Sequence, residues 1–240
     1  MVSRVLYRDG LMLVIDKPAG FAVHPGPKGG ESLEDHFGAL RFGLPRSPAL
    51  AHRLDRDTSG CLVLGRHRKA LALLGRLFKS GAVGKTYWAV VQGVPDADEG
   101  TIALPLGRLD ETRGWWMKHD PKGQPAVTKW KVMGRSATGE SSWLALEPVT
   151  GRTHQLRVHC AEMGWPIVGD ATYGNAPRTG GPVLHLHARE VVVPLYKNRA
   201  AISVVAPVPP HIRMALAQCG WSEETASLRT QRSDPVLGNT

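Results

Sequence analysis

The chain has 240 residues, of which 42% are hydrophobic, so it can bury a substantial core as one large domain or two small ones. No apolar run approaches the length of a membrane span, and residues 1–9 lack the apolar core of a signal peptide. The formal net charge of +9 and the pI of about 9.8 favour a polyanionic partner such as RNA or DNA.

The cysteines indicate the compartment. Cys61, Cys160 and Cys219 are odd in number, far apart in the sequence and contain no CxxC pair. This spacing argues against a disulfide framework and is typical of a reducing compartment. We therefore expect a cytoplasmic monomer that has no membrane partner.

Short apolar runs bounded by turn residues predict a series of strands. These lie at residues 5–7, 11–15, 62–64, 86–91, 127–132, 143–147 and 202–205. The first two flank Asp9-Gly10, a dipeptide typical of a β-hairpin turn. Residues 25–30 are rich in Gly and Pro and predict a loop.

Helices are predicted at residues 31–41, 68–79, 153–164 and 212–219. For the third of these, Thr153 is the predicted N-cap and Gly164 the predicted stop. Because short strands outnumber the helices and the helices are scattered between them, we expect an α+β fold with a mixed, mostly antiparallel sheet.

The chain is predicted to form one domain over residues 1–221. Residues 222–240 are polar, lack aromatic residues and show no hydrophobic period, so we expect them to form a disordered tail.

The most informative segment is residues 52–60, His-Arg-Leu-Asp-Arg-Asp-Thr-Ser-Gly, which directly precede the apolar run at 61–64. No helical or strand period requires this crowding of charges and hydroxyls. A short polar loop that enters a buried strand is where a scaffold presents reactive side chains. A charged turn with an N-capping Asp or Ser would also account for these residues.

Polar residues at defined spacing recur at residues 16–20, 85–93, 150–159 and 169–174. Each of the first three also has a purely structural interpretation. These are a strand that ends in a Pro-Gly turn, an alternating strand with an inward Tyr87, and a helix start with a solvated basic face.

Taken together, these segments resemble the motifs KPxG, HRLDxxTSG, KxYxAxVxG and TGRTHQIRVH of the RluA family of RNA pseudouridine synthases, in the family's order. The resemblance covers residues 16 to about 174. It implies the pseudouridine synthase fold with an active-site cleft, and an isomerase without a cofactor. The implied substrates are uridines in stem-loops of large-subunit rRNA or tRNA. Because the first motif begins at Asp16, we expect the short branch of the family, without an N-terminal RNA-binding module.

The resemblance implies catalytic roles for three residues. Asp55 would be the essential carboxylate, and Arg157 would pair with it and keep it ionised. Tyr87 would lie against the base and assist removal of the C5 proton. Whether Asp55 attacks C1′, attacks C6 or abstracts a sugar proton stays open.

A uridine in a folded stem-loop is stacked, so it has to be flipped out before it reacts. Arg53 is predicted to fill the vacated space, because its planar guanidinium can stack on bases and bind phosphate. Other RNA contacts are predicted for the basic residues and histidines of the motifs, namely Lys17, His52, Arg56, Lys85, Arg152 and His154.

Residues 107–124 interleave cations with Trp115 and Trp116. Exposed aromatics among cations are typical of a surface that binds single-stranded RNA. A long hairpin whose Trp pair packs on the core would give the same pattern.

Histidines lie near several motifs, but their spacing does not favour zinc. His154 and His159 are five apart, unlike a helical i, i+4 pair, and His185 and His187 share one strand face with no carboxylate motif beside them. We expect no metal. Two rival functions stay open, a uracil-releasing N-glycosylase and an RNA-binding protein that has lost catalysis.

Overall fold

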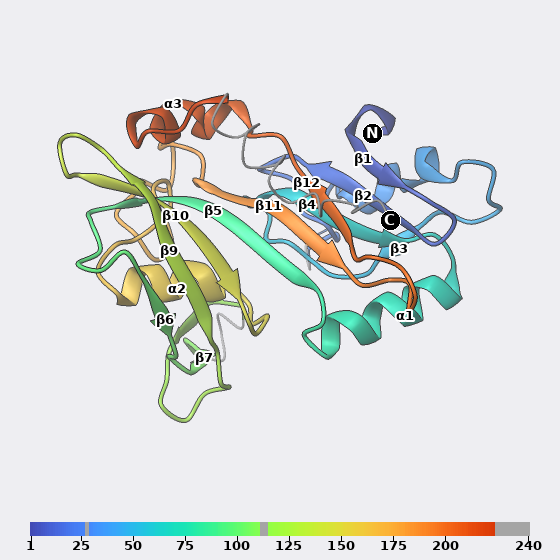
Figure 1. Cartoon of the computed structure of the whole chain (residues 1–240), viewed down its shortest axis with the longest axis horizontal. Coiled ribbons are helices and arrows are strands. Elements are labelled where there is room, and N and C mark those ends of the chain that lie inside the picture. The colour runs from blue at the N-terminus through green and yellow to red at the C-terminus, as the bar shows by residue number, and fades with distance from the viewer. Residues whose placement is uncertain (27–28, 111–114, 224–240) are drawn as a thin grey trace, which may run out of the picture.

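The computed structural model describes residues 1–26, 29–110 and 115–223 (Figure 1). Most of the predicted tail, residues 224–240, lies outside the described residues. The described part forms a large, mostly antiparallel sheet flanked by helices, which confirms the α+β prediction.

The main sheet contains ten strands. Its central path runs β1 (Val5–Arg8), β2 (Met12–Lys17), β4 (Ser59–Gly65), β11 (Leu186–Val193), β5 (Gly84–Gln92), β10 (Ser141–Pro148), β9 (Thr128–Arg135) and β6 (Glu99–Ile102). In addition, β3 (Ala49–Leu50) pairs with β4, and β12 (Ile202–Val205) pairs with β11. The strands β7 (Leu106–Arg108) and β8 (Met117–His119) form a separate hairpin.

All the predicted strands are present, but the central strand β11 was not among them. It pairs antiparallel with β5 and parallel with β4, placing His187 opposite Ser59 and Ala188 opposite Gly60. The motif at residues 52–60 therefore leads into the centre of the sheet.

The helices are α1 (Arg68–Lys79), α2 (Gln155–Glu162), α3 (Pro210–Gln218) and the 3₁₀ segments η1 (Val2–Arg4) and η2 (Leu33–Leu40). The segment predicted at residues 31–41 is thus a 3₁₀ helix and not an α-helix. No helix within the described ranges is long and apolar enough to cross a bilayer.

The start of α2 differs from the prediction. His154, and not Thr153, is the N-cap residue, with a left-handed φ of 52° and no capping bond from its side chain. The reason is that Gln155 closes the preceding turn, since its Oε1 accepts from Arg152 N at 3.1 Å and from Thr150 Oγ1 at 2.6 Å. Gly164 follows the helix with a φ of 83°, as predicted.

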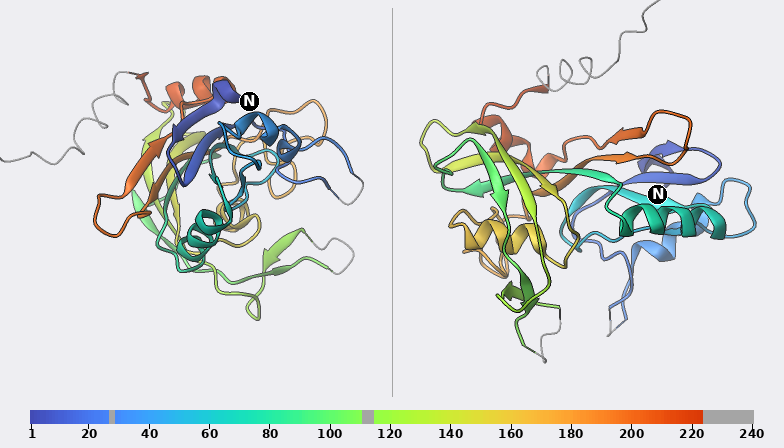
Figure 2. Two further views of the ribbon diagram at one scale, coloured as in Figure 1. Left: turned by 90° about the vertical axis from the view of Figure 1, so that its right-hand side faces the viewer. Right: turned by 60° about the horizontal axis from the view of Figure 1, so that its bottom comes forward.

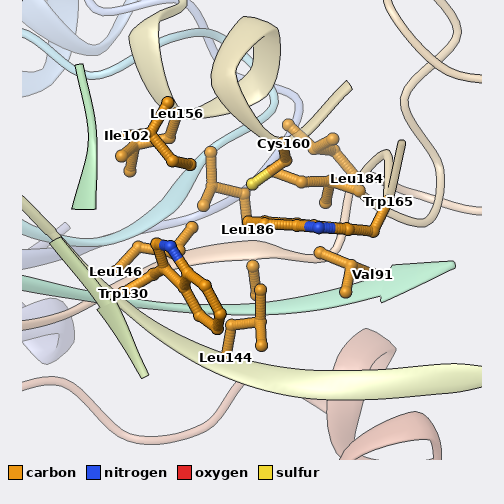
Figure 3. Close-up of a cluster of buried hydrophobic side chains, with 12 residues drawn as sticks. Val91, Ile102, Trp130, Leu144, Leu146, Leu156, Cys160, Trp165, Leu184 and Leu186 are labelled. Atoms are coloured by element: carbon orange, nitrogen blue, oxygen red, sulfur yellow. The ribbon is translucent and has the colours of Figure 1, made fainter. Parts of the chain in front are cut away.

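Alternate residues of β5 serve two cores, because successive side chains of a strand point to opposite faces. Ala89 and Val91 pack in the core under α2, whereas Val90 packs with α3. Leu156 and Cys160, one turn apart on α2, point into the first core (Figure 3). The sheet is thus covered on both faces in this half of the molecule (Figure 2).

In the other half, β4 is buried along its whole length. Cys61 and Val63 pack in the core that includes Leu74 of α1, and Leu62 packs in the core that includes η2. The loop that precedes β4 is therefore attached to one of the most rigid parts of the sheet.

Candidate active site

A cavity of about 480 Å³ opens where the loop before β4 meets β5, β11 and the start of α2. Its lining includes Asp55, Tyr87 and Arg157, so the fold brings the three predicted catalytic residues to one place. Leu186 of β11 lines it too. Sequence reasoning missed Leu186, because nothing distinguishes it from any other buried strand leucine. We call this cavity the cleft.

The end of the Asp55 loop is fixed against β11. Ser59 Oγ lies 2.9 Å from His187 Nδ1, and both residues are buried. Gly60 has a φ of 104°, and a Cβ at this position would collide with the carbonyl oxygen of Ala188. Only glycine fits there, which explains why the motif ends in Ser-Gly.

Lys17 holds the other side of the loop. Its Nζ donates to the carbonyl oxygens of Pro18 (2.9 Å), Arg56 (2.7 Å) and Thr58 (2.8 Å), so the three N–H groups of the ammonium have three acceptors. The side chain is fully buried, and burial lowers its pKa to about 8. These three bonds use the ammonium inside the protein and leave it no free N–H group for the predicted contact with RNA.

His52 also makes contacts within the protein. Its Nε2 accepts from Val63 N at 3.0 Å, and its ring stacks on Phe78 with the centroids 4.4 Å apart. Burial, reinforced by the charge of Lys85, lowers the pKa of His52 to about 4, so the ring is neutral at pH 7. The ring borders the cleft, so the predicted contact of His52 with RNA would involve a neutral imidazole.

Arg157 pairs with Asp170, and not with Asp55 as predicted. Its Nε lies 2.7 Å from Asp170 Oδ2 and its Nη2 lies 2.8 Å from Oδ1, a bidentate pair with side chains 8% and 1% exposed. Asp170 belongs to the segment 169–174, where the motif resemblance ended. Spacing along the chain does not indicate that Asp170 pairs with Arg157, because loops separate it from α2.

Asp170 is saturated with donors. Besides Arg157, the backbone N–H groups of Thr172 and Tyr173 donate to its Oδ1 at 2.9 and 3.0 Å. Burial on its own would raise the pKa of Asp170, but these bonds and the charge of Arg157 outweigh it and hold the pKa below the usual value. The segment that carries Tyr173 is thereby tied to α2.

Asp55 has a much looser environment. Its side chain is 20% exposed, and the one titratable cationic residue within 4 Å of it in the described part of the chain is His154, whose Nε2 lies 3.9 Å from Oδ1. Tyr173 OH accepts from Met117 N at 2.9 Å and lies 2.7 Å from His154 Nδ1. A neutral His154 that accepts the phenol proton at Nδ1 carries its own proton on Nε2, facing Asp55.

His154 was predicted to bind RNA, but its side chain is 8% exposed and its two nitrogens face Asp55 and Tyr173. Burial lowers its pKa, and the charge of Asp55 opposes that effect. We correct its role to that of a buried neighbour of Asp55.

Tyr87 projects from β5 into the cleft. Burial raises the pKa of its phenol strongly, and the negative charge of Asp55 raises it further. The hydroxyl therefore keeps its proton at neutral pH. Tyr87 and Asp55 both line the cleft.

Besides His52 and His154, three of the predicted RNA contacts line the cleft, namely Arg53, Lys85 and Arg152. Arg53 and Arg152 are exposed, whereas Lys85 is half-buried and its pKa is lowered by that burial. Arg56 is absent from the lining. Its side chain is 73% exposed, and its Nε donates to Gly20 O at 3.0 Å.

The predicted RNA surface at residues 107–124 is a hairpin, β7–β8, of which residues 111–114 lie outside the description. Trp115 is 60% exposed, and its ring lies 6.0 Å from that of His154 at the edge of the cleft. Trp116 lies edge-on to Trp115 at 5.7 Å. The alternative of a Trp pair packed in the core is therefore wrong for Trp115.

The residues that the structure describes contain no group of three or more His, Cys, Asp or Glu side chains that could hold a metal ion. All three cysteines are buried and unpaired.

Comparisons with known proteins give one consistent family. Residues 11–162 match the family model described as RNA pseudouridylate synthase. The chain is 42% identical over 211 residues to an RNA pseudouridine synthase of Zymomonas mobilis, covering 87% of this chain and 95% of the relative. It is 34% identical over 225 residues to ribosomal large subunit pseudouridine synthase C of Vibrio cholerae, covering 89% and 68%.

Solved structures agree. The human RNA pseudouridylate synthase domain containing 4 superposes with a TM-score of 0.75 at 28% identity, covering 91% of this chain and 94% of that one. The human RNA pseudouridylate synthase domain containing 1 superposes with the same TM-score and identity, covering 96% of this chain and 95% of that one.

Proposed function

Because the chain belongs to the RluA family of RNA pseudouridine synthases, and is by that membership an isomerase, we propose that it converts specific uridines in RNA stem-loops to pseudouridine with Asp55 as the catalytic carboxylate. Large-subunit rRNA is the first substrate to test, because a relative 34% identical to this chain bears that substrate in its name, and tRNA is the second.

One observation carries the assignment of Asp55. Among the cleft residues, its carboxylate is partly exposed and held by a loop that is fixed by His52 before Asp55 and by Lys17 and Ser59 after it. Such a group is accessible to a substrate and is also held in place, as a nucleophile or base has to be.

The chemistry requires a balanced proton transfer. The N1–C1′ bond breaks, the base turns, and a C5–C1′ bond forms; C5 then loses a proton and N1 gains one. Because its pKa is raised, Tyr87 stays protonated and offers no free phenolate as a base. We therefore assign it the role of a relay that accepts the C5 proton only as it passes its own proton to Asp55.

Arg157 acts on Asp55 indirectly. Its ion pair with Asp170 fixes the segment of Tyr173, whose hydroxyl holds His154 beside Asp55. Arg157 is therefore a positioning residue for the carboxylate, and its own charge reaches Asp55 only in part, because Asp170 neutralises it.

The target base has to leave its stack to reach Asp55. Arg53, exposed on the rim of the cleft two residues before Asp55, is the side chain that we assign to the vacated space. Lys85 and Arg152 on the same rim would bind the flanking phosphates.

Pseudouridine mapping of rRNA and tRNA tests this proposal. Cells that lack the protein should lose pseudouridine at one or a few positions, the wild-type gene should restore it, and Asp55→Asn should not. An unchanged map, or release of free uracil by the purified protein from the same RNA, would contradict the proposal.

A further inference from the structure

A second cavity, of about 630 Å³, lies on the other side of the Asp55 loop. The turn at residues 17–20, the segment at residues 177–184 and the start of α3 line it. Asp57 and Ser59 of the loop face it, whereas Asp55 faces the cleft, and Arg157 borders both cavities. The Asp55 loop and the Arg157–Asp170 pair thus separate two hollows that adjoin each other.

Cationic side chains converge on this second cavity from three separate segments. They are Arg4, Arg178 and Arg213, with Asp16 and Asp57 as the acidic residues of the lining. Arg4 lies 3.5 Å from Asp16, and Arg213 lies 3.7 Å from Glu223, in exposed pairs of little strength. Arg178 forms no ion pair within the described ranges, and its guanidinium lies over the ring of Trp116. The cavity is therefore positive, and its arginines are free to exchange partners for phosphate.

A hydrogen-bonding group in the lining lacks a partner. Nε2 of His211 is buried and bonds to nothing in the described part of the chain. The other ring nitrogen is bonded to the backbone of Leu184, and burial lowers the pKa of the ring, so Nε2 is an acceptor. Buried polar groups are normally paired, and a ribose hydroxyl is a donor that fits this acceptor.

Aromatic rings connect the two cavities. Arg178 lies over the ring of Trp116 at 5.5 Å, Trp116 contacts Trp115 at 5.7 Å, and Trp115 contacts His154 at 6.0 Å. His154 in turn lies beside Asp55. A strand whose uridine enters the cleft would meet the exposed face of Trp115 next, and then the arginines.

We propose that the second cavity binds the nucleotides adjacent to the target uridine in the same RNA strand. Arg178 and Arg213 bind backbone phosphate, His211 accepts a bond from a ribose hydroxyl, and one neighbouring base stacks on Trp115. The inference rests on the proposed function for the identity of the strand, since RNA is the substrate class of that function.

Strand length gives the sharpest test. We would measure the affinity of an oligouridylate of about three nucleotides and one of about ten, since stacking platforms of this kind span roughly four to sixteen nucleotides. The variant Arg178→Gln/Arg213→Gln is compared with Arg46→Gln/Arg68→Gln, which removes the same charge from exposed positions outside both cavities.

The cavity variant should bind the longer strand about tenfold more weakly, with the slope of log Kd against log salt reduced by about 1.4, because two contacts of roughly 0.7 each are lost. Its affinity for the shorter strand should change less than about twofold, and the control should match wild type for both. Trp115→Ala should weaken binding of the longer strand about tenfold without changing the salt slope.

Equal losses for the two strands, or equal losses in the control, would overturn the inference. These binding measurements need no turnover. If the length-dependent loss is found but no pseudouridine is formed in any RNA, the second cavity stands as an RNA site and the proposed function fails.

Discussion

Two carboxylates near the same cleft have opposite environments. Asp170 is 1% exposed and accepts a bidentate pair from Arg157 and two backbone N–H groups. Asp55 is 20% exposed, and the imidazole Nε2 of His154 lies 3.9 Å from its Oδ1. The saturated carboxylate can hold the scaffold but has no free lone pair for a substrate, whereas the unsaturated one does. The comparison therefore supports a structural role for Asp170 and the proposed catalytic role of Asp55.

The largest effect is expected from removing the unsaturated carboxylate. Asp55→Asn should lower the rate of pseudouridine formation by about a thousandfold or more, because a catalytic group is lost. RNA affinity should be kept, since an anion near phosphate contributes little to binding. Single-turnover assays with purified protein measure the rate, and Asp57→Asn on the same loop is the control that should keep it within a few-fold.

On the scaffold side, Arg157→Ala should lower the free energy of unfolding by roughly 3–5 kcal/mol, because it leaves Asp170 buried and unpaired. Adding Asp170→Asn should recover part of the loss, and adding Asp55→Asn should not. Denaturant unfolding of the two double-mutant cycles measures the coupling. Strong coupling of Arg157 to Asp55, and not to Asp170, would contradict the contrast between the two carboxylates.

Tyr87→Phe tests the proposed catalytic role of the Tyr87 hydroxyl. It removes the proposed proton relay and keeps the ring that packs in the core. We expect turnover to fall about a hundredfold with RNA affinity unchanged. A Phe variant as fast as wild type in single-turnover assays would reduce Tyr87 to a packing residue.

A smaller effect concerns pH. Because the pKa of Asp170 is lowered by folding, the native state holds fewer protons than the unfolded state, and the stability from this group is present above the ordinary pKa of 3.8. That stability is lost as pH falls through the folded pKa. The free energy of unfolding should therefore differ most between wild type and Asp170→Asn at pH 7, and the difference should shrink in unfolding experiments at acid pH. A difference that does not change with pH would show that the pair with Arg157 is not ionic.

The smallest effect is expected from chelation. The reaction involves no redox change and no added group, so activity on a pre-folded stem-loop should survive EDTA. Loss of activity that zinc or magnesium restores would show a metal requirement.

Much of the fold could be predicted from local pattern. The Asp9-Gly10 turn marks the first hairpin, and the period of Leu71 and Leu74 marks α1 within the bounds observed. The strand β11 could not be predicted in this way, because its place in the sheet depends on a parallel pairing with β4 more than 120 residues away, as the Ser59–His187 bond shows.

The candidate site could also be predicted only in part. The motifs predicted which residues gather at the cleft, but not the direction of each side chain. Lys17 points into the protein because three carbonyls of two turns lie within reach of its Nζ, and Arg157 pairs with Asp170 because a loop returns under α2. Both outcomes depend on tertiary contacts that spacing in the sequence does not encode.

The most direct test of the division between the two carboxylates measures Asp55→Asn and Asp170→Asn side by side, as the single-turnover rate of pseudouridine formation per folded molecule together with the free energy of unfolding. We predict that Asp170→Asn loses stability and keeps its rate within about tenfold, while Asp55→Asn keeps its stability within about 1 kcal/mol and loses its rate. A rate that collapses in Asp170→Asn but survives in Asp55→Asn would contradict the account.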